Sequence, residues 1–228
     1  MSANRLPSWP ARPSVARRGS RPQRGDHRGG VGADPAQRVG GKGALELQPA
    51  LRHGRRLLCL PGTHTKWVLL EDGVINEFLT APTGELFTLL RDRSVLVREP
   101  GPADSGASPA FERALLEFER FSSAQVLHRL FECRSRMLAG NLQSHEAAPF
   151  LSGLLIASDV AGALSLFAPT LQSRAVHLIG TPQLTALYAK GLARQDCQIR
   201  STDGVLAAVA GLSNVRRQLT GRPGTYAD

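Results

Sequence analysis

Three short apolar runs follow one another between residues 57 and 81, and the turns between them constrain what this chain can fold into. The runs are "LLCL" (57–60), "KWVLLE" (66–71) and "VINEFLTA" (74–81), separated by a Pro-Gly-Thr-His-Thr segment and by Asp-Gly. Asp-Gly between apolar runs is a favoured hairpin turn, and short turns join antiparallel strands. The sequence therefore predicts a three-stranded antiparallel meander that forms one edge of a larger mixed sheet.

The rest of the chain alternates strand-like and helix-like segments, as in an α/β protein. Residues 44–56 give a short helix or turn, and strands are expected at 175–180 and 197–201. Apolar spacing predicts helices over 83–97, 111–140 (two, broken near Ser122-Ser123), 146–167, 181–194 and 203–212. Composition predicts a loop over 98–110, and Gly140 is expected to cap a helix end. The 146–167 helix is apolar on several faces and is expected in the core.

The first 42 residues differ from the rest of the chain. They are rich in Pro, Gly and Arg and have neither a two-residue nor a 3.6-residue apolar period. Such a segment cannot bury enough apolar surface to offset its ordering entropy, so we expect a disordered tail over 1–42 and a folded domain over 43–228. Three origins fit the tail: an arm that binds nucleic acid, an organelle transit peptide, or residues never selected for folding.

Charge is distributed unevenly along the chain. Residues 1–56 contain 12 Lys and Arg against 3 Asp and Glu, whereas residues 57–228 contain 16 of each kind. The net charge of +9 therefore belongs to the beginning of the chain, and the folded part is neutral. The prolines at 7, 10, 13 and 22 disfavour a transit-peptide helix, and Trp9 is the tail's only aromatic side chain. Because binding arms usually interleave aromatic and basic residues, these features argue against a nucleic-acid partner.

Cysteine usage and hydropathy indicate a soluble, cytoplasmic protein. Cys59, Cys133 and Cys197 lie far apart and form no CxxC pair, which favours reduced thiols. His64 or His128 could join them around zinc, but metal-ligand spacing is missing and no metal-ligating residues are expected. The sequence has no run of about 18 apolar residues, so no membrane partner is expected, and its start lacks a signal-peptide pattern.

The turn at 61–66, Pro-Gly-Thr-His-Thr-Lys, has two interpretations. Gly62 lets backbone amides approach a ligand, Thr63 and Thr65 offer hydroxyl donors, and Lys66 adds a positive charge, all of which suit phosphate oxygens. The alternative is a polar hairpin loop without a ligand. On these residues alone, the hairpin loop is favoured.

Two further segments could contribute to a site. The strand at 175–180 ends at Gly180, and Thr181 can cap the next helix with Pro182 at its first position, so that backbone amides face a nucleotide. Such junctions occur in any α/β protein, and a structural role is favoured here. At 83–85, Thr-Gly-Glu opens a helix where a carboxylate suits the helix dipole; contact with a hydroxylated substrate is the functional alternative.

The order and spacing of these segments resemble a known family. "CLPGTHTKWVLLEDGVINEFLTAPTGELFTLL", "FLSGLLIASDV" and "LIGTPQLTALYAKGL" are together similar to the 2-dehydro-3-deoxygalactonokinase family of sugar-acid kinases. The similarity covers about residues 43–211, and its PGTH(S/T)KW and TGELF segments are specific signatures. The family has the actin, sugar kinase and Hsp70 superfold, in which two α/β domains close over ATP and substrate.

This resemblance implies a fold and a set of site residues. The expected fold is the C-terminal actin-like ATPase (ribonuclease H-like) domain, a mixed sheet flanked by helices. The resemblance implies that Gly62, Thr63, His64, Thr65 and Lys66 form the second phosphate loop and that Gly180 and Thr181 bind adenosine; Thr83, Gly84 and Glu85 match a signature on the substrate side.

The implied reaction is ATP-dependent phosphorylation of the terminal hydroxyl of 2-dehydro-3-deoxy-D-galactonate in galactonate catabolism, with Mg²⁺ bridging the phosphates. A homo-oligomer is compatible with it. Family members carry a preceding domain that begins with an Asp-Trp-Gly-Thr first phosphate loop, and this chain contains no such stretch. We therefore expect the tail before residue 43 to be a frame-shifted or mis-started reading of the gene. The general base stays unassigned, and the chain alone is expected to have little activity.

Two other classes of function compete with the kinase. A non-catalytic nucleic-acid-binding protein would use the basic tail, and its affinity would fall steeply with salt. A structural remnant of a larger protein would expose apolar surface and self-associate.

Overall fold

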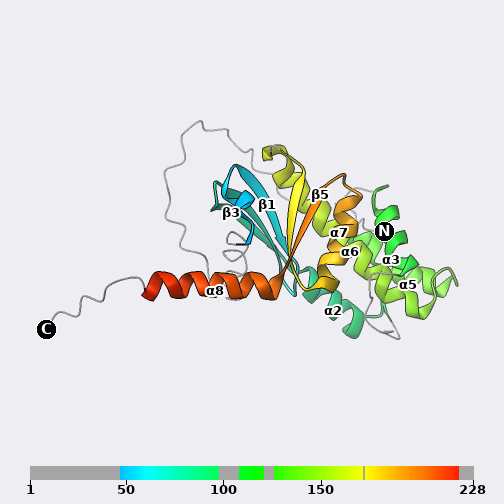
Figure 1. Ribbon diagram of the computed structural model, residues 1–228. Coiled ribbons are helices and arrows are strands. Elements are labelled where there is room, and N and C mark those ends of the chain that lie inside the picture. The colour runs from blue at the N-terminus through cyan, green and yellow to red at the C-terminus, as the bar shows by residue number, and fades with distance from the viewer. Residues whose placement is uncertain (1–46, 98–107, 121–125, 172, 221–228) are drawn as a thin grey trace, which may run out of the picture. The chain divides into compact units, whose positions relative to one another are not determined.

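The computed structural model describes residues 47–97, 108–120, 126–171 and 173–220, so the tail expected over 1–42 lies outside the described residues. The described strands and helices alternate as expected for an α/β protein (Figure 1). In chain order the elements are η1 (Pro49–Arg52), β1 (Arg55–Leu60), β2 (Thr65–Glu71), β3 (Val74–Ala81), α2 (Thr83–Arg93), α3 (Pro109–Phe118), α4 (Val126–Leu130), α5 (Glu132–Leu138), α6 (Ser144–Phe167), η3 (Ala168–Thr170), β4 (Ala175–Gly180), α7 (Pro182–Ala193), β5 (Gln198–Asp203) and α8 (Gly204–Thr220).

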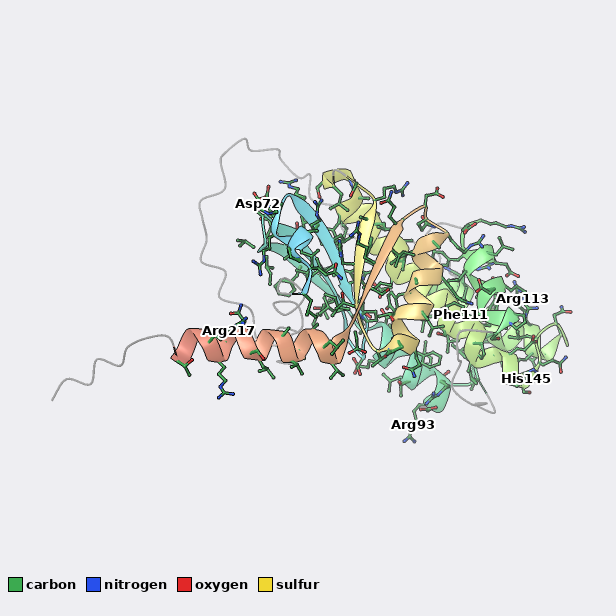
Figure 2. All side chains as sticks on the ribbon, in the orientation of Figure 1. Asp72, Arg93, Phe111, Arg113, His145 and Arg217 are labelled. Atoms are coloured by element: carbon green, nitrogen blue, oxygen red, sulfur yellow. The ribbon has the colours of Figure 1, made fainter. Side chains whose placement is uncertain are left out.

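The five strands form a mixed sheet in the order β3-β2-β1-β4-β5. β2 pairs antiparallel with both β1 and β3, whereas β4 pairs parallel with β1 and with β5. The predicted meander is therefore confirmed, and it forms one edge of the sheet. Its β2–β3 turn has φ of 50° at Asp72 and 77° at Gly73, and positive φ at both central residues fits the predicted Asp-Gly hairpin turn (Figure 2).

One face of the sheet is packed against helices, and we call it the covered face. Its side chains come from alternate positions of the three central strands: Leu57, Cys59, Trp67, Leu69, Val176 and Leu178. They join a large buried cluster to which α3, α6 and α7 also contribute. The main core of the described chain therefore lies on this side of the sheet.

Helix α6 is the centre of that core, as its apolar sequence predicted. It is long and apolar enough to cross a membrane, but 61% of its most apolar stretch is buried within the protein. It contacts α2, α3, α5 and α7. A capping box starts it, because the Gln143 side chain accepts from the Glu146 amide while the Glu146 side chain accepts from the Gln143 amide. Helix α6 is thus the core helix of the domain.

The opposite face, which we call the open face, carries a much smaller core. Its buried apolar residues are Leu51, Leu58, Leu60, Leu70, Ile179 and Ala207. Polar side chains lie among them: His177 on β4 is 4% exposed, and its Nδ1 lies 2.9 Å from Oε1 of Gln48. Gln48 in turn donates from Nε2 to the Thr202 hydroxyl. This arrangement assigns the amide oxygen of Gln48 to His177, whose Nδ1 therefore carries the proton.

Four expectations about helix boundaries need correction. The helix predicted over 83–97 ends at Arg93. The loop predicted over 98–110 ends early, since α3 begins at Pro109, where the Ser108 hydroxyl caps it by accepting from Ala110 N. Residues 98–107 and the break near Ser122-Ser123 lie outside the described residues. The segment 111–140 contains parts of three helices rather than two, because α4 and α5 are separate. The last helix was expected to end near 212 but continues to Thr220.

The predicted helix end at Gly140 is confirmed. Gly140 has φ of 73° and donates to the Met137 carbonyl, while Asn141 donates to the Arg136 carbonyl. These two hydrogen bonds form a Schellman motif, which needs a residue with positive φ.

Candidate phosphate-binding edge of the sheet

The sheet topology brings all three predicted site segments to one edge. β1, β4 and β5 are parallel, and β3 runs in the same direction as β1 because two antiparallel pairings separate them. The residues that follow these four strands therefore lie at a common carboxyl edge, as do the residues that precede β2. The segments concerned are 61–64, 82–85, 180–182 and 203–204. In open α/β sheets this edge is where ligands bind.

The 61–66 turn and the Thr-Gly-Glu segment pack directly against each other. A Cβ atom on Gly84 would lie 2.5 Å from the carbonyl oxygen of Gly62, so only glycine fits there. The Glu85 amide donates to the Thr63 carbonyl (2.9 Å), and Nε2 of His64 lies 2.8 Å from Oε2 of Glu85. The start of α2 thus fixes the backbone of the turn from one side.

Gly180 connects the turn to the far side of the edge. A Cβ atom on Gly204, the first residue of α8, would lie 3.0 Å from the Cα atom of Gly180. A Cβ atom on Gly180 itself would lie 3.6 Å from the Pro61 carbonyl oxygen. The backbone at this edge is therefore a continuous row that runs from α2 through the turn to β4 and α8.

The five predicted phosphate-loop residues are not equivalent. Gly62 is partly exposed and Thr63 and His64 are exposed, whereas Thr65 and Lys66 belong to β2 and are 0% and 6% exposed. The Lys66 ammonium donates to the Thr80 hydroxyl (2.8 Å) on the neighbouring strand. The Lys66 side chain is thus engaged within the sheet and the Thr65 hydroxyl lies against Tyr188 of α7, so the residues accessible to a ligand are 62–64.

Three helices begin at this edge, and their first turns differ. In α8 the amides of Val205 and Leu206 both donate to Oδ1 of Asp203 (2.8 and 3.0 Å). In α2, Glu85 supplies an acidic first turn. Helix α7 has neither feature among the described residues: its first turn contains no acidic residue and no side chain caps it. Its positive end is therefore the least compensated of the three, which favours an anion.

The predicted cap at Thr181 is only partly right. Thr181 occupies the N-cap position of α7 with Pro182 following, as expected, but its hydroxyl makes no capping hydrogen bond within the described part of the chain. Its carbonyl oxygen accepts instead from the Thr185 hydroxyl (3.0 Å). Thr181 and Pro182 are both exposed.

A partly buried polar group behind the edge was missed in the sequence. Asp159 of α6 accepts from Nε1 of Trp67 (2.8 Å), the hydroxyl of Thr83 (2.7 Å) and the hydroxyl of Tyr188 (2.6 Å). The Thr65 hydroxyl lies 2.7 Å from that of Tyr188. One carboxylate therefore ties β2, the start of α2 and α7 together. The signal was present, since Asp159 is the only charged residue between Glu146 and Arg174.

Burial dominates the electrostatics of this group. Removal from water raises the pKa of Asp159, and hydrogen bonds from Tyr188, Thr83 and Trp67 oppose that rise. Burial, and then repulsion from Asp159, raises the pKa of Tyr188 well above its usual value. Tyr188 therefore stays protonated and donates a hydrogen bond to Asp159. The Thr65 hydroxyl must then donate its hydrogen bond to the Tyr188 oxygen. The result is a directed relay of hydrogen bonds from Thr65 to Asp159.

The cysteines do not form a metal site in the described structure. No group of three or more His, Cys, Asp or Glu side chains could hold a metal ion in the residues that the structure describes. Cys59 and Cys133 are buried, and burial raises the pKa of the Cys133 thiol to about 12. Both side chains pack in the core of the covered face.

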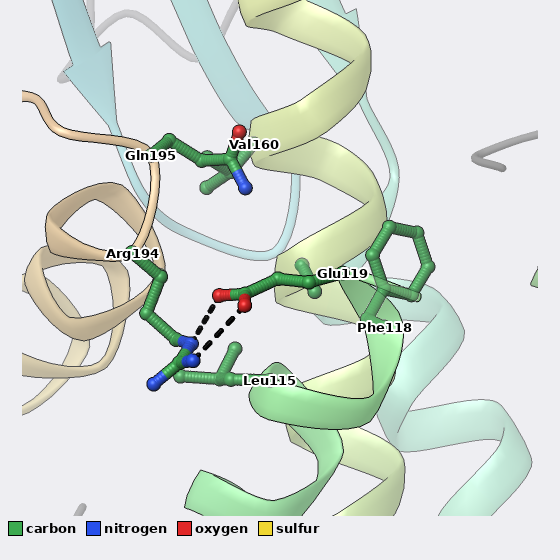
Figure 3. A pocket seen from close by; sticks show the side chains of 8 residues that line it. Leu115, Phe118, Glu119, Val160, Arg194 and Gln195 are labelled. Carbon is green, nitrogen blue, oxygen red and sulfur yellow. Dashed lines mark hydrogen bonds and ion pairs between the residues drawn. The ribbon is translucent and has the colours of Figure 1, made fainter. Parts of the chain in front are cut away.

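A small depression between α3, α6 and α7 is distinct from this edge. It is lined by residues such as Leu115, Val160 and Gln195, and the ion pair between Arg194 and Glu119 bridges it (Figure 3). Its volume of about 10 Å³ is enough for about one water molecule. Because Arg194 follows α7, the depression lies at the opposite end of that helix from Thr181.

Comparisons with known proteins identify the family of this chain. Residues 42–215 match the 2-keto-3-deoxy-galactonokinase family. The "Probable 2-dehydro-3-deoxygalactonokinase DgoK1" of Rhizobium meliloti (strain 1021) is 36% identical over 168 residues, which are 73% of this chain and 54% of that protein. The 2-dehydro-3-deoxygalactonokinase of Escherichia coli (strain K12) is 33% identical over 174 residues, 76% of this chain and 56% of that protein.

A solved structure supports the same assignment. A crystal structure from Sinorhizobium meliloti, of a protein assigned the same kinase activity, superposes with a TM-score of 0.71 at 33% identity and covers 80% of this chain and 59% of that one. The expected mixed sheet flanked by helices is confirmed. The chain spans about half the length of the curated relatives that it matches. By the match over residues 42–215, the chain belongs to the 2-keto-3-deoxy-galactonokinase family.

Proposed function

We propose that this chain supplies part of a cytoplasmic 2-dehydro-3-deoxygalactonokinase, which transfers a phosphoryl group from ATP to the terminal hydroxyl of 2-dehydro-3-deoxy-D-galactonate in galactonate catabolism. Family membership gives the reaction class. The observation that carries the proposal is the continuous backbone row in which the turn at 61–64 packs against the start of α2 through Gly62 and Thr63 and against Gly180 through Pro61. A close-packed edge of this kind lets backbone amides approach phosphate oxygens.

The phosphates would lie against residues 62–64. Gly62, Thr63 and His64 are the accessible members of the predicted loop, and their backbone is held by Gly84 and Glu85. Phosphoryl transfer depends mainly on positioning and on neutralising charge, so a rigid loop with polar hydrogens is what this chain can contribute. In this proposal Thr65 and Lys66 fix the loop to the sheet rather than contact the phosphates.

The adenosine would lie beside Gly180 and Thr181, at the start of α7. The exposed N-terminus of α7 has no acidic residue in its first turn and so suits a phosphate or a ribose oxygen nearby. The sugar acid would approach from Thr83, Gly84 and Glu85. Of these three, Glu85 is the exposed side chain, and it is held by His64.

Mg²⁺ accompanies ATP in the proposed reaction and would neutralise phosphate charge. The described residues hold no cluster of three ligands for it, and both carboxylates at the edge are engaged, Glu85 by His64 and Asp203 by the first turn of α8. These residues do not form a magnesium cage, so the ion would be held by phosphate oxygens and water.

The nucleotide contact can be tested without turnover. Titration of ¹⁵N-labelled protein with MgATP should shift the amide resonances of Gly62, Thr63 and His64 and of Gly180 and Thr181. Gly84→Ala forces the loop away from α2 and should raise the apparent Kd for MgATP, measured from these shifts, at least tenfold. Gly162→Ala is the matched control, because no atom lies within 4 Å of a Cβ atom there. Shifts confined to residues outside this edge would contradict the proposed site.

Turnover gives a second test. A coupled ADP-release assay with ATP and 2-dehydro-3-deoxy-D-galactonate should show little activity for this chain alone, because the resemblance places the first phosphate loop and the general base in the part of the relatives that the chain does not match. Gluconate-derived acid serves as the substrate control. A kcat within tenfold of about 10 s⁻¹, a common value for enzymes, would contradict the need for a second part.

A further inference from the structure

The elements that carry the three predicted site segments are linked by one side chain, Asp159 of α6. Its Oδ1 accepts from Nε1 of Trp67, on the strand that follows the phosphate loop. Its Oδ2 accepts from the hydroxyl of Thr83, which opens α2, and from that of Tyr188 on α7. A single carboxylate therefore holds β2, α2 and α7 together at the back of the site.

On the side of α2, the link reaches the phosphate loop within one residue. Thr83 precedes Gly84, where a Cβ atom would lie 2.5 Å from the carbonyl oxygen of Gly62. The next amide, that of Glu85, donates to the Thr63 carbonyl (2.9 Å). Because this contact has no spare room, a displacement of Thr83 would move the loop as well.

On the side of α7, a helix carries the link to the proposed adenosine contact. Tyr188 lies six residues after Pro182, which is about 9 Å along the helix axis. The hydroxyl of Tyr188 also accepts from Thr65, the first residue of β2 after the loop. The phosphate side and the adenosine side of the site are therefore joined at the Tyr188 oxygen, which Asp159 holds.

The charge of Asp159 is costly at this position. Asp159 is the only charged residue between Glu146 and Arg174, and burial raises its pKa, so folding disfavours the carboxylate form. An apolar side chain would avoid that cost. A costly ionisable group that receives hydrogen bonds from three elements is typical of a functional position.

We infer that Asp159 is a positioning residue of the proposed nucleotide site, and that its carboxylate fixes the spacing between residues 62–64, 83–85 and 180–181. The inference rests on the proposed function, and Asp159 acts through its partners without touching the ligands. The Thr83 hydroxyl donates to Asp159 and the Thr65 hydroxyl donates to Tyr188, so neither hydrogen is left for a ligand. Phosphoryl transfer depends on positioning, which makes this spacing important for the reaction.

Two substitutions separate these hydrogen bonds from the charge. Asp159→Ala removes all three. Asp159→Asn can keep all three, because its carbonyl oxygen accepts from Trp67 and its two amide hydrogens donate to the hydroxyls of Thr83 and Tyr188. Val160→Ala is the matched control, since it truncates the neighbouring side chain of α6, which is 1% exposed, and removes no hydrogen bond.

Hydrogen exchange of the unliganded chain measures the positioning. The Glu85 amide donates to the Thr63 carbonyl and the Thr185 amide to the Thr181 carbonyl (3.0 Å), so these amides report on the starts of α2 and α7. Asp159→Ala should speed the exchange of both amides at least about tenfold relative to the control in α6, because local opening becomes easier. Asp159→Asn should stay within about threefold of the wild type.

A single-branch variant tests whether the links act separately. Thr83→Val removes only the hydrogen bond between α2 and Asp159. It should speed exchange at Glu85 and leave exchange at Thr185 unchanged, since the link to α7 stays intact.

Titration with MgATP then connects the positioning to the ligand. The apparent Kd should rise at least about tenfold in Asp159→Ala, which is a loss of about 1.4 kcal/mol of binding. It should change by less than about threefold in Asp159→Asn and in Val160→Ala.

Three outcomes would overturn the inference. Equal exchange rates in Asp159→Ala and Val160→Ala would make Asp159 an ordinary core residue. Exchange as fast in Asp159→Asn as in Asp159→Ala would mean that charge acts and not the three hydrogen bonds. An unchanged Kd in Asp159→Ala would mean that the spacing does not matter to the nucleotide. If the wild-type chain binds no MgATP, the proposed function fails, whereas the exchange rates still decide whether Asp159 positions the three segments.

Discussion

The two faces of the sheet differ in how much of their packing this chain supplies. The covered face packs against α6, α3 and α7 in one large cluster that includes Trp67 and Phe150. The open face has six buried apolar residues in its cluster and holds the charged or ionisable side chains of Lys66 and His177 among them. One layer of the domain is therefore complete, and the other depends on few apolar contacts.

The covered face mainly determines the stability of the domain, whereas the open face is available for interactions. Buried apolar area is the main stabilising term of a domain, and most of the buried apolar residues lie in the cluster on the covered face. The open face has exposed apolar residues on β3 and α8. We therefore expect substitutions on the covered face to unfold the domain, whereas substitutions on the open face change what the domain binds.

The largest expected effect compares two aromatic residues of the meander. Trp67→Ala should lower the free energy of unfolding by about 3–5 kcal/mol, because it removes a fully buried ring and the hydrogen bond to Asp159. Phe78→Ala, on the open face, should cost less than about 1 kcal/mol since its ring is 47% exposed. Urea unfolding measures both. Equal losses would mean that the open face is as well packed as the covered one.

The second effect is the pH dependence of the open face. Burial lowers the pKa of His177 to about 4, with Arg200 and Arg56 adding to the shift. The neutral ring therefore contributes stability above its unfolded pKa of about 6.5, and this contribution is lost as the pH falls from 6.5 to 4. The loss should be about 3 kcal/mol.

His177→Gln provides the measurement, because glutamine does not titrate. The difference in unfolding free energy between wild type and variant should shrink by that amount from pH 7 to pH 4. Asp159 of α6 gives the opposite dependence of stability on pH. Its pKa is raised in the folded protein, so its contribution to stability is present below the unfolded pKa of about 3.9 and is lost as the pH rises through the folded pKa. If the unfolding free energies of wild type and His177→Gln change in parallel with pH, His177 is not the group that titrates.

A smaller loss is expected from the hydrogen-bond relay behind the edge. Tyr188→Phe keeps the ring, which lies 6.4 Å from that of Trp67, but removes the donor to the Asp159 carboxylate. A hydrogen bond to a charged group contributes about 1.5–3 kcal/mol, so thermal unfolding should show a loss of that size. Thr170→Val, which removes a hydroxyl bonded to a backbone carbonyl away from the edge, is the control. A loss below about 0.5 kcal/mol would show that water replaces the donor.

The smallest effect concerns an ion pair at the rim of the helix layer. Arg194→Met removes the pair with Glu119, whose two side chains are 32% and 33% exposed. The expected cost is about 0.5 kcal/mol at low salt and less in 1 M NaCl, because salt screens exposed charges. A cost above about 2 kcal/mol that persists in high salt would mean that the covered face depends on charge as well as on burial.

Local chemistry made most of the fold predictable. The meander follows from Asp72-Gly73, which needs positive φ at both residues, and the end of α5 follows from Gly140 for the same reason. Helix α3 was predicted to start two residues too late, although Ser108 and Pro109 form a helix start, because their loop-like composition outweighed that signal. Such errors occur at helix boundaries, where the capping residues and the overall composition of a segment predict different first residues.

The site was only partly predictable from the residues. The contact of Gly84 with Gly62 joins segments about twenty residues apart and follows from the sheet topology rather than from a local pattern. Asp159 was missed because one carboxylate in an apolar helix has no periodicity to reveal its partners. The exposed apolar face of α8, with Val205, Val209 and Leu212, was missed because apolar spacing defines a helix face without stating which face packs on the sheet.

The junction between β5 and α8 has a mechanical consequence. Asp203 is the last residue of the strand and Gly204 the first of the helix, so no loop separates them. The 17 residues of α8 form a helix of about 25 Å that starts in contact with Gly180 and is packed on the sheet through Ala207. The first turn of α8 and the carboxyl edge therefore share backbone contacts, so a substitution that displaces Gly204 would also change the shape of that edge.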